Sequence, residues 1–176
     1  QRINVAIKTG ELANNAELVR TMDAAKADNK PMHLMGLVSD GGVHSHINHL
    51  KALLDICKDR GLKEVYVHAF TDGRDTDPKS GLHFIEDLQN HIDAIGLGKI
   101  ATVSGRYYAM DRDKRWERVC KAYDALVNGA GDTATSGVEA VKESYEENIT
   151  DEFINPTVIV DADNKPVATM REGDHV

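Results

Sequence analysis

Five short segments of the chain carry the residue patterns expected of β-strands. Residues 2–7 alternate polar and apolar side chains, which is the period of a strand with one buried face. Residues 32–38 are almost entirely apolar, as in a strand covered on both faces. Further strands are expected at residues 64–70, 99–104 and 157–160. These five segments are spread over the whole length of the chain.

Between these segments, apolar residues recur every three or four positions, which is the period of amphipathic helices. Asn14 and Asn15 can cap the first helix. Later helices are expected over residues 45–60, 80–95, 113–127 and 136–148. The predicted inward faces are Leu18, Met22 and Ala25; Ile47, Leu50, Leu54 and Cys57; Leu82, Ile85, Leu88, Ile92 and Ile95; and Trp116, Val119, Cys120, Tyr123 and Val127.

The order of these elements predicts the fold class. Strands that alternate with helices form βαβ units and a mostly parallel sheet. A turn over residues 161–166 is expected to join residues 157–160 to residues 167–170 as a hairpin. We therefore predict an α/β fold, a three-layer open sheet that is mostly parallel and has a C-terminal β-hairpin.

Composition narrows the class of protein. The chain has 176 residues and a formal net charge of −8, which argues against nucleic-acid binding because that function needs a basic face. No apolar run approaches the roughly 20 residues of a membrane span, so no membrane partner is expected. Cys57 and Cys120 are far apart and are predicted to be buried hydrophobic residues, so a cytoplasmic location is expected. Neither terminus resembles a natural one, and we expect a fragment of a longer protein.

Three consecutive strands end in polar loops that contain glycine, at residues 39–46, 71–78 and 104–113. Ligands of open α/β sheets bind outside the carboxyl ends of the strands. If the three strands are neighbours, all three loops line one site.

The side chains of these loops indicate the kind of ligand. Arg74, Arg106 and Arg112 carry forked donors that suit phosphate or carboxylate groups. Asp75 can accept hydrogen bonds from hydroxyl groups, and glycine allows backbone N–H groups to approach an anion. The predicted ligand is small, anionic and hydroxylated, as a phosphorylated hydroxy acid is.

Two other classes of function remain open at this point. His44 and His46, with Asp40 nearby, have a spacing that could bind a metal ion in a metal-dependent hydrolase. The chain could also be an anion-binding module without catalysis. No nucleophile elbow, Walker loop or HExxH motif is present, so the chain is not expected to perform phosphoryl chemistry alone. Arg115 and Arg118 are expected to project from a helix surface.

The three loops closely resemble those of the cofactor-independent (2,3-bisphosphoglycerate-independent) phosphoglycerate mutases. The resemblance rests on SDGGVHSH at residues 39–46, DGRDTDP at residues 72–78 and GRYYAMDRDKRWER at residues 105–118. The opening segments INVAI at residues 3–7 and GEL at residues 10–12 fit as well, and the similarity runs from end to end.

This resemblance implies an isomerase of glycolysis and gluconeogenesis that interconverts 3-phosphoglycerate and 2-phosphoglycerate. Family members combine an alkaline-phosphatase-like domain, with a serine nucleophile and two Mn²⁺ ions, and an inserted substrate-binding (phosphotransferase) domain. Residues 1–176 correspond to the inserted domain only, so the nucleophile and the metal ligands are expected outside this fragment. No 2,3-bisphosphoglycerate is required.

By position in these motifs, the resemblance assigns five substrate-binding residues to this chain: His44, Arg74, Asp75, Arg106 and Arg112. It assigns no catalytic nucleophile and no metal ligand here. The fragment alone is therefore expected to be inactive.

Overall fold

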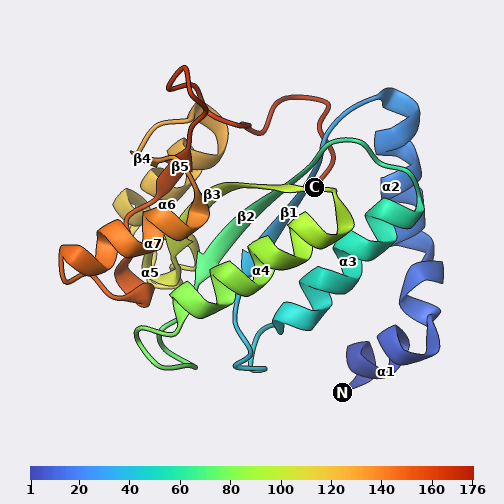
Figure 1. The fold of residues 1–176 in the computed structure, drawn as a ribbon, viewed down its shortest axis with the longest axis horizontal. Coiled ribbons are helices and arrows are strands. Elements are labelled where there is room, and N and C mark those ends of the chain that lie inside the picture. The colour runs from blue at the N-terminus through green and yellow to red at the C-terminus, as the bar shows by residue number, and fades with distance from the viewer.

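The computed structural model describes residues 1–176, which form one five-stranded sheet with helices around it (Figure 1). The strands are β1 (Met32–Leu37), β2 (Val65–Thr71), β3 (Lys99–Gly105), β4 (Asp132–Ala134) and β5 (Thr157–Ile159). The α-helices are α1 (Arg2–Thr9), α2 (Ala16–Asp28), α3 (Ile47–Asp59), α4 (Gly81–Ile95), α5 (Arg106–Ala109), α6 (Trp116–Tyr123) and α7 (Gly137–Glu146). Short 3-10 or π turns follow at η1 (Glu11–Asn14), η2 (Asp124–Asn128) and η3 (Asp151–Phe153).

The strand order is β1-β2-β3-β5-β4, and β1, β2 and β3 are parallel neighbours. Leu37 pairs with Phe70, and Thr71 pairs with Gly105, so the three strands end level with one another. β5 runs antiparallel to β3, and β4 is parallel to β5. The predicted mostly parallel α/β sheet is confirmed, and its register brings three loops to one edge.

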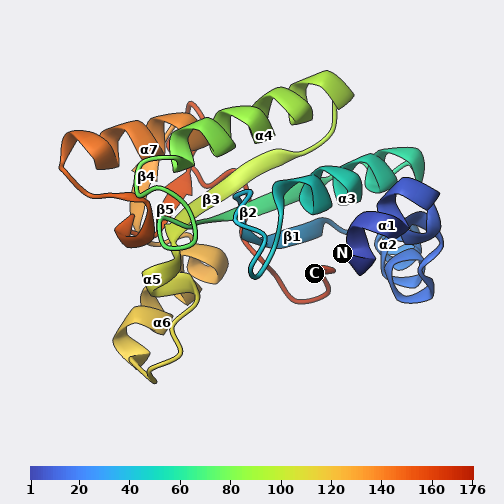
Figure 2. The same ribbon diagram turned by 90° about the horizontal axis from the view of Figure 1, so that it is seen from below.

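The sheet lies between two sets of segments. Figure 2 shows α3, α4 and α7 on one side, and α5, α6 and the C-terminal segment on the other. The main core forms on the first side, where Leu54, Ile85 and Leu88 of the helices cluster with Val67 and Val103 of the strands, all fully buried. Burial of each such side chain contributes roughly 1.5–3 kcal/mol.

Side-chain hydrogen bonds cap the first turn of two of the predicted helices, α2 and α7. The Asn15 side chain accepts hydrogen bonds from the N–H groups of Glu17 and Leu18 and so begins α2. Ser136 begins α7 in the same way, by accepting from the N–H of Glu139. None of the helices combines the length and the apolar character that crossing a membrane requires.

The prediction of a strand at residues 2–7 was wrong, because this segment is helix α1. An apolar residue at every second position also places Ile3 and Ile7 one helical turn apart, so six residues fit either period. Gly10, with φ of 77°, ends the helix in the left-handed conformation.

The expected C-terminal hairpin is reduced to a closed turn. The Asp161 N–H donates to the Lys165 carbonyl at 2.8 Å, and a single antiparallel bridge joins Val160 to Pro166. The Val167 N–H donates to the Ile159 carbonyl at 2.9 Å, and the pairing ends there. The N–H of Met170 instead donates to the Leu126 carbonyl, so residues 167–170 form no strand.

The predicted inward face of residues 113–127 was also wrong. Trp116, Cys120 and Tyr123 are exposed, and the buried residues of this segment are Ala122 and Ala125. Figure 2 shows the reason, since α5 and α6 form an arm that extends away from the sheet.

A buried hydrogen-bonded chain crosses the second face of the sheet. His33 Nε2 lies 3.0 Å from the Asp174 carboxylate, His33 Nδ1 lies 2.9 Å from His68 Nε2, and His68 Nδ1 lies 3.0 Å from the Thr102 hydroxyl. An ionised carboxylate only accepts, so these hydrogen bonds are all satisfied when each histidine donates through Nε2 and accepts at Nδ1. Burial and the adjacent His33 lower the pKa of His68 to about 3.

We expect this buried hydrogen-bonded network to make the folded protein less stable in mild acid. Between pH 6.5 and pH 3 the unfolded chain takes up a proton at His68 that the folded chain cannot accept. The free energy of unfolding therefore falls as pH falls, by up to about 1.4 kcal/mol per pH unit from this group. Urea unfolding of the His68→Gln variant at several pH values should show a shallower slope, while His83→Gln, at an exposed position on α4, should keep the wild-type slope. Equal slopes for wild type and His68→Gln would contradict this account.

Candidate anion-binding site

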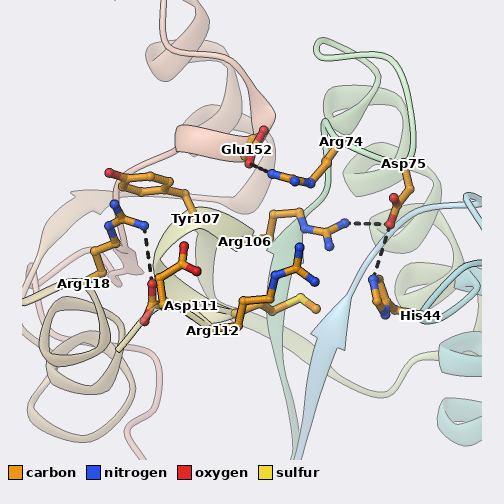
Figure 3. A pocket seen from close by; sticks show the side chains of 11 residues that line it. His44, Arg74, Asp75, Arg106, Tyr107, Asp111, Arg112, Arg118 and Glu152 are labelled. Carbon is orange, nitrogen blue, oxygen red and sulfur yellow. Dashed lines mark hydrogen bonds and ion pairs between the residues drawn. The ribbon is translucent and has the colours of Figure 1, made fainter. Parts of the chain in front are cut away.

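A pocket of about 440 Å³ opens at the edge where β1, β2 and β3 end (Figure 3). Its wall is almost entirely polar or charged, with four arginines and four carboxylates. The lining residues are His44, Arg74, Asp75, Arg106, Tyr107, Met110, Asp111, Arg112, Asp113, Arg118 and Glu152.

Asp72, buried beneath the pocket, joins the three loops that follow these strands. One carboxylate oxygen accepts from the N–H groups of Arg74 and Asp75 in its own loop, at 3.2 and 2.9 Å. The same oxygen accepts from Arg106 at 2.8 Å, and the other accepts from the Ser39 hydroxyl at 2.7 Å. Burial alone would raise the pKa of Asp72, but these hydrogen bonds outweigh burial and lower it.

Arg106 is held between two carboxylates. Its Nη1 lies 2.8 Å from Asp72 and 2.7 Å from Asp75, and its side chain is only 11% exposed. Burial opposes the charge, yet the bonds to Asp75 and Asp72 raise the pKa of Arg106 further. His44 Nε2 lies 3.8 Å from the same Asp75 carboxylate. One side of the pocket thus presents a fixed cation, a carboxylate and an imidazole together.

Arg118 forms the opposite wall (Figure 3). Its guanidinium stacks on the Tyr107 ring at 3.8 Å and lies 3.4 Å from the buried carboxylate of Asp111. Asp111 also accepts from the N–H of Arg115, which fixes the start of α6. The prediction that Arg118 projects from a helix surface was therefore wrong.

Arg112 differs from the other arginines of the pocket because its side chain makes no ion pair and no hydrogen bond. The other three each pair with at least one carboxylate. In Figure 3 the Arg112 guanidinium points toward the space beside Arg106. Its whole guanidinium is therefore free to bind an incoming anion.

The structure brings all five residues that the sequence singled out, namely His44, Arg74, Asp75, Arg106 and Arg112, to this one pocket. Their role in binding stays a prediction. Sequence reasoning missed Glu152, whose carboxylate lies 3.3 Å from Arg74 Nη1. No motif marks Glu152, since it lies 78 residues from Arg74 in the chain. The only sequence feature that could have indicated Arg118 as a pocket residue was the run of charged residues that begins at Asp111.

The geometry does not support a metal site built on His44 and His46. His46 Nδ1 accepts from the N–H of Asn48 at the start of α3, and His46 lines a different cavity from His44. No group of three or more histidine, cysteine or acidic side chains is arranged to hold a metal ion. The residues of this chain therefore do not fit a manganese centre.

Comparison with known proteins gives concordant matches. Residues 3–176 match the sequence family described as BPG-independent PGAM N-terminus. The chain is 58% identical to 2,3-bisphosphoglycerate-independent phosphoglycerate mutase of Clostridium novyi over 175 residues, and 57% identical to that of Flavobacterium johnsoniae. Both matches cover 99% of this chain and 34% of the relative, so the chain spans about a third of their length. It also superimposes on the crystal structure of Leishmania mexicana phosphoglycerate mutase at low cobalt concentration, with TM-score 0.92 and 32% identity over 98% of this chain and 33% of that one.

We expect Asp72→Asn to destabilise the protein by about 3 kcal/mol, because it removes the buried one of the two carboxylates that pair with Arg106 and turns one acceptor into a donor. The free energy of unfolding in urea measures the loss. Asp40→Asn, an exposed carboxylate in the neighbouring loop, is the matched control and should change stability by less than about 0.5 kcal/mol. Equal effects of the two substitutions would show that Asp72 does not join the loops.

Proposed function

Since this chain belongs to the family of BPG-independent phosphoglycerate mutases, as their N-terminal domain, we propose that it binds the phosphoglycerate on which the whole enzyme acts. The whole enzyme is proposed to interconvert 3-phosphoglycerate and 2-phosphoglycerate, an isomerisation used in glycolysis and gluconeogenesis. This activity requires the remaining two thirds of the protein.

The observation that carries the proposal is the unpaired Arg112 in a pocket walled by fixed charges. Phosphoglycerate offers a carboxylate, a phosphate and a free hydroxyl. Guanidinium groups bind the first two through charge-assisted hydrogen bonds. Asp75 is suited to the hydroxyl because its carboxylate is only partly exposed and already oriented by Arg106.

The positions of the side chains suggest a division of roles. Arg112 binds one anionic group directly. Arg106, fixed by Asp72 and Asp75, presents its remaining N–H groups to the other. His44 borders the same pocket and can donate to a phosphoryl oxygen.

The phosphoryl transfer itself is proposed to occur on the alkaline-phosphatase-like part of the protein. A serine there takes the phosphoryl group from one glycerate oxygen and returns it to the other. In this chain Ser39 and Ser104 are buried away from any ligand, and the Ser45 hydroxyl donates to the Leu37 carbonyl, so none of the three is positioned as an activated nucleophile. The two Mn²⁺ ions of the proposal belong to that other part, and no 2,3-bisphosphoglycerate takes part. A cytoplasmic location fits this proposal.

We expect Arg112→Ala to weaken binding of 3-phosphoglycerate about 10- to 100-fold, because charge-assisted hydrogen bonds contribute roughly 1.5–3 kcal/mol each. Isothermal titration of the purified chain, and KM in the full-length enzyme, measure the loss. The melting temperature should stay unchanged, since Arg112 contacts no other side chain through polar groups.

Arg115→Ala is the matched control, because Arg115 is an exposed arginine three positions further along that does not line the pocket. It should leave binding within about twofold of wild type. Wild-type affinity in Arg112→Ala would contradict the assignment of this pocket. Binding without mutase activity in the full-length protein would favour an anion-binding module.

A second expectation concerns Asp75, which can hold the hydroxyl proton as the phosphoryl group leaves and returns. In the full-length enzyme, Asp75→Asn should lower kcat at least about 100-fold while changing KM less. Steady-state kinetics separates the two effects. Full activity in this variant would exclude the proton-transfer role, while a raised KM alone would leave only a binding role.

A further inference from the structure

Asp151 anchors the short turn η3, which contains Glu152. Its side chain is fully buried, and its carboxylate accepts from the N–H of Gly81 at 2.7 Å and from the Tyr145 hydroxyl. Its carbonyl accepts from the Thr71 hydroxyl at 2.7 Å, and its N–H donates to the Pro78 carbonyl at 2.9 Å. Asp151 is therefore bonded to both ends of the loop that carries Arg74 and Asp75.

Glu152 is fixed just as closely. A Cβ atom on Gly73 would lie 2.7 Å from the Glu152 nitrogen, and one on Gly105 would collide with the Glu152 carbonyl. The turn thus lies directly against two of the loops that form the pocket. Glu152 is not a freely moving surface side chain, since only 18% of that side chain is exposed.

The carboxylate of Glu152 faces into the anion-binding pocket. Figure 3 shows it on the pocket wall, paired with Arg74, whose side chain is 58% exposed. A carboxylate at this position cannot attract an anionic ligand. It occupies Arg74 and adds a negative charge that every bound anion experiences.

The charges of the lining side chains show the consequence. Four arginines face four carboxylates, and only Arg112 is left without a carboxylate partner. The pocket therefore offers little net positive charge, and a ligand with additional negative groups is opposed by the fixed carboxylates.

We propose that Glu152 is a specificity-determining residue, which limits how many negative charges a ligand can bring into the pocket. It favours an acid with one phosphate over the corresponding acid with two. The inference rests on the proposed function, because it assumes that this pocket binds phosphoglycerate. The physical basis is that repulsion by one fixed charge grows in proportion to the charge of the ligand.

The test is a series of ligands with increasing charge. Glycerate carries one carboxylate, 3-phosphoglycerate adds one phosphate, and 2,3-bisphosphoglycerate adds a second; each phosphate contributes about 1.5–2 negative charges at pH 7. Dissociation constants, or inhibition constants in the full-length enzyme, are measured for wild type, Glu152→Gln and Glu146→Gln. Glu146 is exposed on α7 and lies outside the pocket, so its variant has the same net charge.

Glu152→Gln should bind all three ligands more tightly, with a gain that rises from about twofold for glycerate to about 15- to 30-fold for 2,3-bisphosphoglycerate at low salt. The rise should diminish as salt is added, because ions screen a partly exposed charge. Glu146→Gln should show no such rise.

Four results would overturn the proposal. An equal change for all three ligands, or a loss of stability with no dependence on ligand charge, would show that Glu152 is only structural. Weaker binding of all ligands would show that Glu152 aims Arg74 at them. Absence of phosphoglycerate binding by wild type, in both the chain and the full-length enzyme, would instead reject the proposed function and this inference with it.

Discussion

The arrangement of the site depends on one buried carboxylate. Asp72 receives hydrogen bonds from Ser39 after β1, from its own loop after β2, and from Arg106 after β3. The parallel register brings the three strand ends level, but it does not by itself fix the loops that follow. Asp72 does so, because a buried carboxylate must have its oxygens satisfied and four donors from three loops satisfy it. The position of the Arg106 side chain is thereby coupled to the backbone positions of the loops after β1 and β2.

Pairing the arginines with carboxylates has two opposite effects. It immobilises long side chains before a ligand arrives, so less side-chain entropy is lost on binding. It also reduces the positive charge that a ligand meets. The structure separates these effects in space, since Arg106 and Arg118 are tightly held while Arg112 is left unpaired. A small anion is then received by one open cation among fixed ones.

Much of this was predictable from sequence because the relevant signals are local. Runs of apolar residues identified β1, β2 and β3. The polar loops that follow them supplied the three arginines and Asp75 as candidate binding residues, and the family resemblance added His44. The failures have physical reasons. Residues 2–7 were too few to distinguish two periods, and Trp116 belongs to an arm that does not pack on the core. Glu152 reaches Arg74 only through the tertiary fold, which no local pattern encodes.

The position of β5 explains why Glu152 could not be found locally and why it matters. β5 enters the sheet between β3 and β4, antiparallel to β3, so the residues before it arrive beside the ends of the parallel strands. There the N–H of Gly105 donates to the Ile154 carbonyl at 2.8 Å, and the Tyr108 hydroxyl donates to Asn155. The loop with the arginines is thus supported by a segment far away in sequence. The loop sequences supply the binding groups, but their geometry is set by the reversed strand, so grafting the loops alone onto another parallel sheet would not reproduce the site.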